Sequence, residues 1–440
     1  MLFSSNTFLF FFLPITVITY YLCPKRLRNG QLLIASLIFY GWGEPKFLPL
    51  MLVVILLNYF CGIAAANRME RGRSTMPVLW IAVALNLSIL CFFKYRQFFF
   101  GNLLPGIALP LGISFYIFQA MGYTIDVIRK EVPAQRSFLT FGTYVTLFPQ
   151  LVAGPIVRYR DIAEQLRDRR ENATAFAQGL QRFTLGLSKK VLLANTFGSA
   201  WNALRESSGC VSGWLGLACY TLQIYFDFSG YSDMAIGLGN LFGFTFLENF
   251  NYPYVSQSIT EFWRRWHISL SSWFKEYVYI PLGGNRKGKA RQILNIMIVW
   301  LLTGLWHGAS WNFVLWGGYY AVILIAEKLW LLNRVKRWPA GIRHAGTMLA
   351  VMVGWAIFYF EDLKQLTSFF LRLLFPRTPV EGLFYLPMLL LGGFCALPAS
   401  GAFFRKMPDS VKWAACFVLL MLCVASLASK SYNPFIYFRF

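Results

Sequence analysis

The residues with the clearest potential for chemistry are histidines, and the chain of 440 residues contains only three of them. His307 lies in LLTGLWHGASWNFVLWGG (residues 301–318), which is otherwise strongly apolar, whereas His267 and His344 have basic neighbours. An ionisable side chain at membrane depth is costly and marks a functional site by default. Because imidazole titrates near neutral pH, His307 is suited to take up a proton and return it. The alternative is a structural imidazole satisfied by a neighbouring helix.

Helical spacing predicts the neighbours of His307. On one helix through this segment, Ser310 shares the face of His307 and Trp311 lies one turn away. Gly304 and Gly308 are four residues apart and would admit a second backbone or a substrate. Tryptophans around the histidine would exclude lipid and water. The predicted lining of the site comprises Trp306, Ser310, Trp311 and Asn312, with Trp316 as a further part of the wall.

No second reactive group is evident in the sequence. A Gly-x-Ser-x-Gly nucleophile elbow and a recognisable histidine–carboxylate spacing are both missing. Residues 283–290 (GGNRKGKA) resemble a Walker A loop, but Ala290 stands where a hydroxyl must hold magnesium. The eight cysteines include no Cys-x-x-Cys pair, so we expect neither a zinc site nor a disulfide framework. A lone buried base favours direct transfer to a hydroxyl from an activated donor such as a thioester, without a tightly bound cofactor or metal.

Two further groups of charged residues are candidates for function. Asp227 and Asp233 flank a polar stretch beside an apolar run, so they either line a polar tunnel or hold two helices together. A basic group could bind the phosphates of coenzyme A or an acidic carrier protein, although it also has the charge that sets membrane topology. The candidate donor-binding residues are Arg264, Arg265, Lys275, Arg286 and Lys287.

Composition places these residues in a multi-pass membrane protein. Hydrophobic residues make up 57% of the chain, charged residues only 14%, and the mean hydropathy is +0.50. Apolar runs near the length of about 20 residues that a spanning helix needs recur along the chain, so we expect helices. The formal net charge of +22 fits membrane topology and anionic lipid better than nucleic acid. The clearest apolar runs are 8–22, 48–66, 78–93, 214–226, 292–305, 313–325, 347–360 and 412–428.

We expect one membrane domain over residues 1–440. Lys25, Arg26 and Arg28 directly follow the first apolar run, and the positive-inside rule then places the N-terminus outside. Segments 158–190 and 256–292 mix basic residues with apolar or aromatic ones, so both are predicted to lie along the cytoplasmic interface.

Longer motifs resemble one family. Residues 249–286 (NFNYPYVSQSITEFWRRWHISLSSWFKEYVYIPLGGNR) and 300–317 (WLLTGLWHGASWNFVLWG) are similar to the core of the membrane-bound O-acyltransferases, here residues 249–328. LFPQLVAGPIVRY at 147–159 and DFSGYSDMAIGLG at 227–239 resemble its envelope branch, which acts in alginate and peptidoglycan O-acetylation and teichoic-acid D-alanylation. The resemblance implies an all-α ring of roughly 10–14 transmembrane helices with in-plane segments around a central funnel. It also implies that His307 is the reactive histidine and His267 an accessory one.

The sequence therefore predicts an O-acyltransferase, with acetyl as the favoured group, in the bacterial cytoplasmic membrane. The donor would be acetyl coenzyme A or an acyl-carrier protein in the cytosol. The acceptor would be an extracytoplasmic polysaccharide or a partner resembling an acyltransferase or esterase. Two alternatives remain at this stage: a transporter or flippase of lipid-linked saccharide, and a passive docking channel that serves a separate transferase.

The last residues, 433–440 (NPFIYFRF), are aromatic and apolar. They resemble tails at the C-termini of envelope-acylation membrane components. Tyr437 is either an interfacial anchor or a nucleophile that enters the tunnel and accepts the acyl group before relay to the partner.

Overall fold

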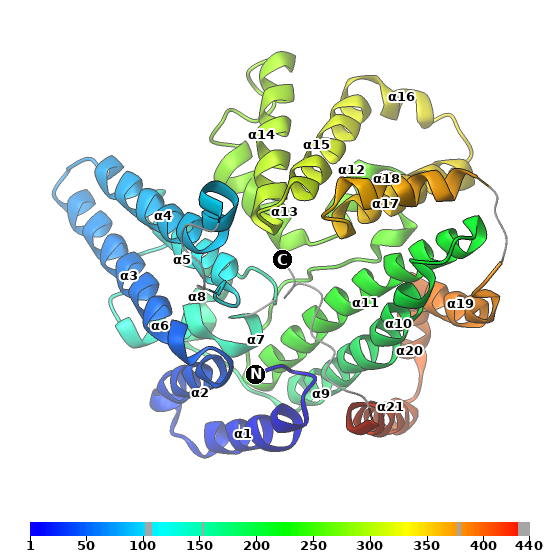
Figure 1. Cartoon of the computed structure of the whole chain (residues 1–440). Helices are drawn as coiled ribbons and strands as arrows, with labels where there is room; N and C mark the ends of the chain where they lie inside the picture. The colour runs from blue at the N-terminus through cyan, green and yellow to red at the C-terminus, as the bar shows by residue number, and fades with distance from the viewer. Residues whose placement is uncertain (102–107, 152–153, 376–379, 430–440) are drawn as a thin grey trace. The chain divides into compact units, whose positions relative to one another are not determined.

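The structure, a computed structural model, describes residues 1–101, 108–151, 154–375 and 380–429. Within these ranges all regular structure is helical (Figure 1), which confirms the all-α prediction. Lipid explains this choice, because a helix satisfies its backbone hydrogen bonds within one segment. Tyr437 lies outside the described residues.

Five helices in the described part of the chain are long and apolar enough to cross a membrane, and a sixth arises if one bent pair is a single span. That number is below the predicted 10–14. The helix at Phe8–Leu22 is apolar but short, and the runs at 214–226 and 292–305 belong to longer helices with polar ends. The ring and its funnel therefore stay predictions. The five spans are Pro45–Glu70, Met76–Arg96, Trp311–Val335, Ala340–Tyr359 and Asp409–Ser429, and the bent pair is Leu383–Cys395 with Pro398–Lys406.

The chain divides into two compact units, and both contain candidate spans. The first unit comprises residues 1–187, 231–247 and 427–430, and the second comprises 188–230, 248–426 and 431–440. The boundary falls within α11 (Cys210–Leu241). The prediction of one membrane domain stays a prediction. The other helices of the first unit are α1 (Leu13–Leu22), α2 (Arg28–Gly43), α3 (Leu48–Glu70), α4 (Met76–Phe100), α5 (Ile113–Ile128), α6 (Phe138–Thr146), α7 (Phe148–Leu151), α8 (Tyr159–Arg167) and α9 (Ala173–Ser188), whose last residue begins the second unit.

Buried amides join three helices of the first unit. Asn58 on α3 and Asn86 on α4 exchange two hydrogen bonds of 3.0 Å between their side-chain amides. The hydroxyl of Thr124 on α5 donates to the Asn58 amide oxygen at 3.0 Å. Polar contacts of this kind between membrane helices contribute roughly 0.6 to 2 kcal/mol each. They fix the mutual rotation of α3, α4 and α5, which apolar packing alone specifies weakly.

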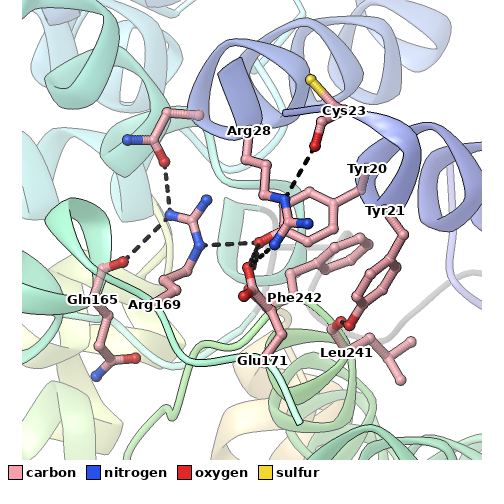
Figure 2. A network of polar contacts seen from close by, with 10 residues as sticks. Tyr20, Tyr21, Cys23, Arg28, Gln165, Arg169, Glu171, Leu241 and Phe242 are labelled. Carbon is pink, nitrogen blue, oxygen red and sulfur yellow. Dashed lines mark hydrogen bonds and ion pairs between the residues drawn. The ribbon is translucent and has the colours of Figure 1, made fainter. Parts of the chain in front are cut away.

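A second polar network in this unit is shown in Figure 2. Arg28, at the start of α2, forms an ion pair of 2.6 Å with Glu171, and the hydroxyl of Tyr20 donates to the same carboxylate at 2.6 Å. Arg169 donates to the Tyr20 hydroxyl at 3.1 Å and to the Asn29 amide oxygen at 2.6 Å. Burial alone would raise the pKa of Glu171, but the hydrogen bonds and Arg28 outweigh it and lower this pKa below its ordinary value. The network ties α1 and α2 to the connection between α8 and α9.

The second unit contains the region predicted to be the core, residues 249–328. This region and the segment after it contain three long helices: α14 (Lys289–His307), α15 (Trp311–Ala326) and, after the short α16, α17 (Ala340–Tyr359). The helices α14 and α15 lie side by side in Figure 1. Its remaining helices are α10 (Asn195–Leu204), α12 (Ile259–Arg265), α13 (Ile268–Phe274), α16 (Leu332–Val335), α18 (Leu363–Leu374), α19 (Leu386–Cys395), α20 (Pro398–Lys406) and α21 (Asp409–Ser429).

Four π-helical turns interrupt the described helices. They are η1 (Phe8–Phe12), η5 (Lys189–Ala194), η7 (Lys275–Tyr279) and η8 (Glu327–Leu331). Such turns occur frequently at functional sites. Two of them orient buried charges in the second unit, because η5 carries Lys190 and η8 carries Glu327.

Candidate active site

His307 is the last residue of α14, so the prediction of one helix through residues 301–318 was wrong. Gly308 is extended, and α15 begins at Trp311. A methyl group at residue 308 would collide with the ring of Phe313, so the turn requires a glycine here. Because the chain reverses, Ser310 sits at the N-cap of α15 and does not share a helical face with His307. Trp311 is 62% exposed and does not belong to the buried wall.

Close packing of α14 against α15 confirms the predicted role of Gly304. A methyl group there would collide with the backbone oxygen of Phe313, and one at Gly317 would collide with that of Trp300. Small residues let two backbones approach closely in membrane proteins. The two helices therefore form a tight hairpin, and His307 lies at its turn.

Three aromatic rings enclose His307, which is only 5% exposed. The ring centroids of Trp306, Trp316 and Phe358 lie 4.9, 5.0 and 5.1 Å from that of the imidazole, all in edge arrangements. Asn312, predicted as a lining residue, supports this wall, because its amide donates to the backbone oxygen of Phe358 at 2.9 Å. His307 is thus largely shielded from water.

His267 lies at the turn between α12 and α13, and its ring contacts the same wall. The imidazole packs perpendicular to Phe228 at 4.7 Å and approaches Trp306 at 5.9 Å. Both histidines therefore contact the ring of Trp306. The two histidines, which are far apart in the sequence, come together around one indole.

The helices α12 and α13 run alongside α14 as a hairpin. Trp263, on α12, packs against Trp300 at 4.7 Å, in the middle of α14, and His267 reaches the level of Trp306. Since Trp300 and Trp306 are six residues apart on α14, the hairpin rises by about 9 Å between these two contacts. The prediction that segment 256–292 lies along the cytoplasmic interface stays a prediction.

A buried carboxylate holds the foot of this hairpin. The two oxygens of Glu327 accept hydrogen bonds of 2.7 Å from the backbone N–H groups of Ile259 and Thr260. Ser258 caps the same helix, and its hydroxyl accepts from the N–H of Glu261 at 3.0 Å. A carboxylate at a helix N-terminus is stabilised by the unpaired N–H groups there. The N-terminal end of α12, the helix that leads to His267, is thus held in place.

The predicted tunnel acids each have a cationic partner. Asp227 on α11 forms an ion pair of 2.6 Å with Lys190, and these side chains are 1% and 5% exposed. Asp233 pairs with Arg182 at 2.9 Å, with 17% and 29% exposure. Both contacts join neighbouring helices, which favours the tie between helices over a tunnel lining.

The predicted donor-binding residues lie on the surface of the second unit. Arg264, Lys275, Arg286 and Lys287 are exposed, whereas Arg265 forms an ion pair with Glu261 at 3.0 Å. Arg286 and Lys287 precede the first residue of α14, and His307 is its last. The 19 residues of α14 span about 28 Å, so the loop and the histidine lie at opposite ends of one helix.

More basic residues gather at the loop end of this helix bundle. Lys328 lies on η8, Arg334 on α16, Lys336 and Arg337 between α16 and α17, and Arg343 on the first turn of α17. Lys328 lies 5.7 Å over the ring of Tyr279, and the amide of Asn295 on α14 donates to the backbone oxygen of Gly284 at 2.9 Å.

Sequence reasoning missed two supporting residues, Glu327 and Asn249. The amide oxygen of Asn249 lies 3.2 Å from Nδ1 of His267. The signal for Glu327 was its position, as a glutamate, in an otherwise apolar helix. No local pattern points to Asn249, because its partners lie 18 to 20 positions away in the sequence.

A family model defines the class of protein. The model described as MBOAT, membrane-bound O-acyltransferase family, matches residues 78–370. The chain belongs to the membrane-bound O-acyltransferase family. It is accordingly an O-acyltransferase and a multi-pass membrane protein, and the transporter alternative is set aside.

The relatives identify the branch of this family. Over 100% of both chains, the protein is 39% identical to a probable alginate O-acetylase (AlgI) of Pseudomonas putida. It is 30% identical to a peptidoglycan O-acetyltransferase of Helicobacter pylori over 100% of this chain and 98% of that one. A teichoic acid D-alanyltransferase of Lacticaseibacillus rhamnosus is 28% identical over 67% of this chain and 77% of its own. The predicted resemblance to the envelope branch is confirmed.

Proposed function

We propose that this enzyme moves an acetyl group from a cytosolic thioester to a hydroxyl group outside the bacterial inner membrane. The acceptor is an extracytoplasmic polysaccharide or a relay partner. The observation that carries the proposal is His307, a base buried by three aromatic rings and separated by the length of α14 from a basic loop. Two of the relatives named above are an acetylase and an acetyltransferase, which supports acetyl as the group transferred.

The chemistry needs one base and a preformed pocket. His307 accepts the proton of the acceptor hydroxyl while the oxygen attacks the carbonyl carbon of the thioester. The new C–O bond forms, the C–S bond breaks, and the departing thiolate takes the proton from His307. The imidazole returns to its neutral state, so each turnover needs no metal or nucleotide. His267, which also contacts Trp306, assists in this step.

Polar groups in the aromatic cluster are available to a substrate. Among the described residues, the indole N–H groups of Trp263 and Trp316 and the hydroxyl of Tyr320 have no hydrogen-bond partner. Buried donors are normally satisfied, and a polar ligand is one way to satisfy them. The oxygen of an acetyl carbonyl or of a saccharide hydroxyl can accept hydrogen bonds from these donors.

The function is tested by following label from acetyl thioester to polymer in membranes that contain the enzyme. Label is expected to appear as alkali-labile ester on the polymer with wild-type enzyme and to be absent with His307→Gln. A passive channel would instead pass donor without forming ester when the extracytoplasmic partner is omitted and a soluble hydroxyl acceptor is supplied. Intact donor and no ester under those conditions would overturn direct transfer.

The exposed loop around Arg286 and Lys287 is proposed to face the cytosol and dock the donor. Reversing both residues to glutamate is expected to raise the KM for donor by more than it lowers kcat, because only encounter and binding depend on their charge. The effect should shrink as salt rises from low to physiological concentration, since exposed charges are screened. The measurement is initial rate against donor concentration at two salt concentrations.

A matched control reverses Arg334 and Lys336, which are exposed at the same basic end. If the control raises KM equally, the general potential of this end is responsible and the loop is not a docking site. Labelling of a cysteine at position 287 from the outside would contradict the assigned side at once.

Tyr437 is proposed to accept the acetyl group and to relay it to an extracytoplasmic partner. The hydroxyl would attack the thioester with His307 as base, which splits one transfer into two. Tyr437→Phe keeps the aromatic ring and removes the nucleophile, so we expect loss of polymer acetylation with normal membrane insertion. Polymer acetylation at the wild-type rate would make Tyr437 an anchor only. Tyr385→Phe is the matched control, at a half-buried tyrosine of the second unit.

A further inference from the structure

The turn that carries His267 is clamped to a short segment after α11. The backbone N–H of Asn251 donates to the oxygen of Arg265 at 2.9 Å, and the N–H of Ile268 donates to the oxygen of Asn249 at 3.0 Å. His267 lies between these two hydrogen bonds. Asn249 is fully buried, so its side chain is held by the clamp on the inner side of the turn.

The side chain of Asn249 is oriented by a donor whose role is fixed. Its Oδ1 atom lies 3.1 Å from the backbone nitrogen of Ser269 and 2.9 Å from the Ser269 hydroxyl. A backbone N–H can only donate, so the Asn249 atom that it meets is the amide oxygen. The same oxygen lies 3.2 Å from Nδ1 of His267. An oxygen of this kind only accepts, so Nδ1 of His267 must carry hydrogen.

The backbone of His267 is strained, which shows how firmly the ring is placed. Its φ angle is 45°, in the left-handed region that residues with a side chain rarely adopt. Such a conformation costs about 1–3 kcal/mol and persists only where the surroundings determine it. Here the clamp, the perpendicular Phe228 ring and Asn249 supply that determination.

The ring is uncharged at ordinary pH. His267 belongs to the turn of the α12–α13 hairpin, outside the five spanning helices, and is 1% exposed. Burial lowers the pKa of His267 to about 3. A neutral imidazole has one N–H, so placing it on Nδ1 leaves Nε2 with a lone pair.

We propose that Asn249 is a positioning residue that holds His267 as the Nδ1–H tautomer, so that Nε2 binds the acceptor hydroxyl. A bare Nε2 cannot donate to the thioester carbonyl, and it accepts a hydrogen bond from an alcohol. His267 thereby orients the acceptor hydroxyl while His307 removes its proton. The assignment of the tautomer depends on the contacts of Asn249. The binding of the acceptor hydroxyl by Nε2 rests on the proposed function.

The tautomer can be observed directly, because the chain has only three histidines. The experiment is solid-state nitrogen NMR of the full-length enzyme in lipid bilayers, with ¹⁵N-histidine label and assignment by His267→Gln. A protonated nitrogen and a bare one have well separated resonances. We expect protonated Nδ1 and bare Nε2 for His267 in the wild type. Bare Nδ1 in the wild-type enzyme would overturn the proposal whatever the Asn249 variants show.

Three variants test the part played by Asn249. Asn249→Leu keeps the volume and removes the acceptor, so the signal of His267 is expected to shift to the Nε2–H form or to a mixture. Asn249→Asp keeps an accepting oxygen and is expected to keep Nδ1 protonated. Ser269→Ala is the control: it removes the hydroxyl that lies 2.9 Å from this oxygen and 3.5 Å from Nδ1 of His267, and a wild-type signal is expected because the Asn249 oxygen stays. An unchanged signal in Asn249→Leu would overturn the proposal.

Transfer assays on the same variants separate this inference from the proposed function. Loss of the partner that orients a metal-binding histidine typically costs ~10–100-fold, and a cost of the same order is expected for a histidine that orients a hydroxyl. We expect a loss of that size in Asn249→Leu, mainly in the KM for acceptor alcohol, with unchanged KM for donor. Asn249→Asp should recover much of it. If the tautomer changes and the rate does not, hydroxyl binding by His267 is wrong, while the tautomer assignment holds.

Discussion

Replacement of His307 by glutamine is expected to abolish acyl transfer and to leave the enzyme folded in the membrane. Glutamine is similar in size to histidine, so the wall of Trp306, Trp316 and Phe358 can stay closed. It cannot take up a proton, and loss of a positioned base costs ~10²–10⁴-fold in rate. His307→Ala should lose as much activity but also some stability, because it leaves a cavity. The measurement is acetyl ester formed per enzyme in detergent or membranes.

His344→Gln is the matched histidine control. His344 is half-buried on α17, and its Nδ1 lies 3.2 Å from the backbone oxygen of Ser256. It belongs to the basic end of the bundle, so a near wild-type rate is expected. Ordinary acylation by folded His307→Gln would end the assignment of His307 as the base.

The buried ion pair between Lys190 and Asp227 gives the second large effect. Lys190→Met alone leaves a carboxylate uncompensated in a dry interior, which costs about 3–5 kcal/mol. Replacing both partners, in Lys190→Met/Asp227→Leu, removes both charges and is expected to recover most of that loss. The measurement is reversible unfolding of the solubilised enzyme, or its thermal midpoint with matched lipid and detergent.

The more exposed pair of Arg182 and Asp233 is the control, because water and salt screen it. Arg182→Met should therefore cost clearly less than Lys190→Met. Equal losses would show that burial does not decide the strength of these contacts. The double variant also separates the two possible roles of Asp227, as a contact between helices and as a lining residue of the tunnel. Full stability without acyl transfer would support the tunnel role.

The sequence was most informative where one residue contradicted its surroundings. His307 could be selected because an imidazole is costly among leucines and tryptophans, and the helical class followed from hydropathy. The break after His307 could not be predicted in this way. Apolar residues continue through the turn, so the hydrophobic periodicity shows no helix boundary. A glycine at position 308 is equally compatible with a closely packed helix and with a reversal of the chain.

Contacts between distant segments were beyond sequence reasoning. The pairing of Asn249 with His267 depends on how α11 ends and how the following segment meets the α12–α13 turn. Segment 256–292 has the aromatic and basic residues of an interface, yet Glu327 and the face of α14 set its direction. Composition predicts the environment that a side chain prefers, whereas tertiary packing decides which of its possible neighbours it meets.

The tight contact of α14 with α15 has a consequence for the biogenesis of the enzyme. Gly304 meets Phe313 and Gly317 meets Trp300, so these contacts join residues that are near in sequence and can form soon after synthesis. Phe358 is supplied by α17, which leaves the ribosome later. During synthesis His307 is therefore set in its turn before its last wall exists. The aromatic wall around His307 is completed only when α17 is inserted, and until then the proposed base is open on one side.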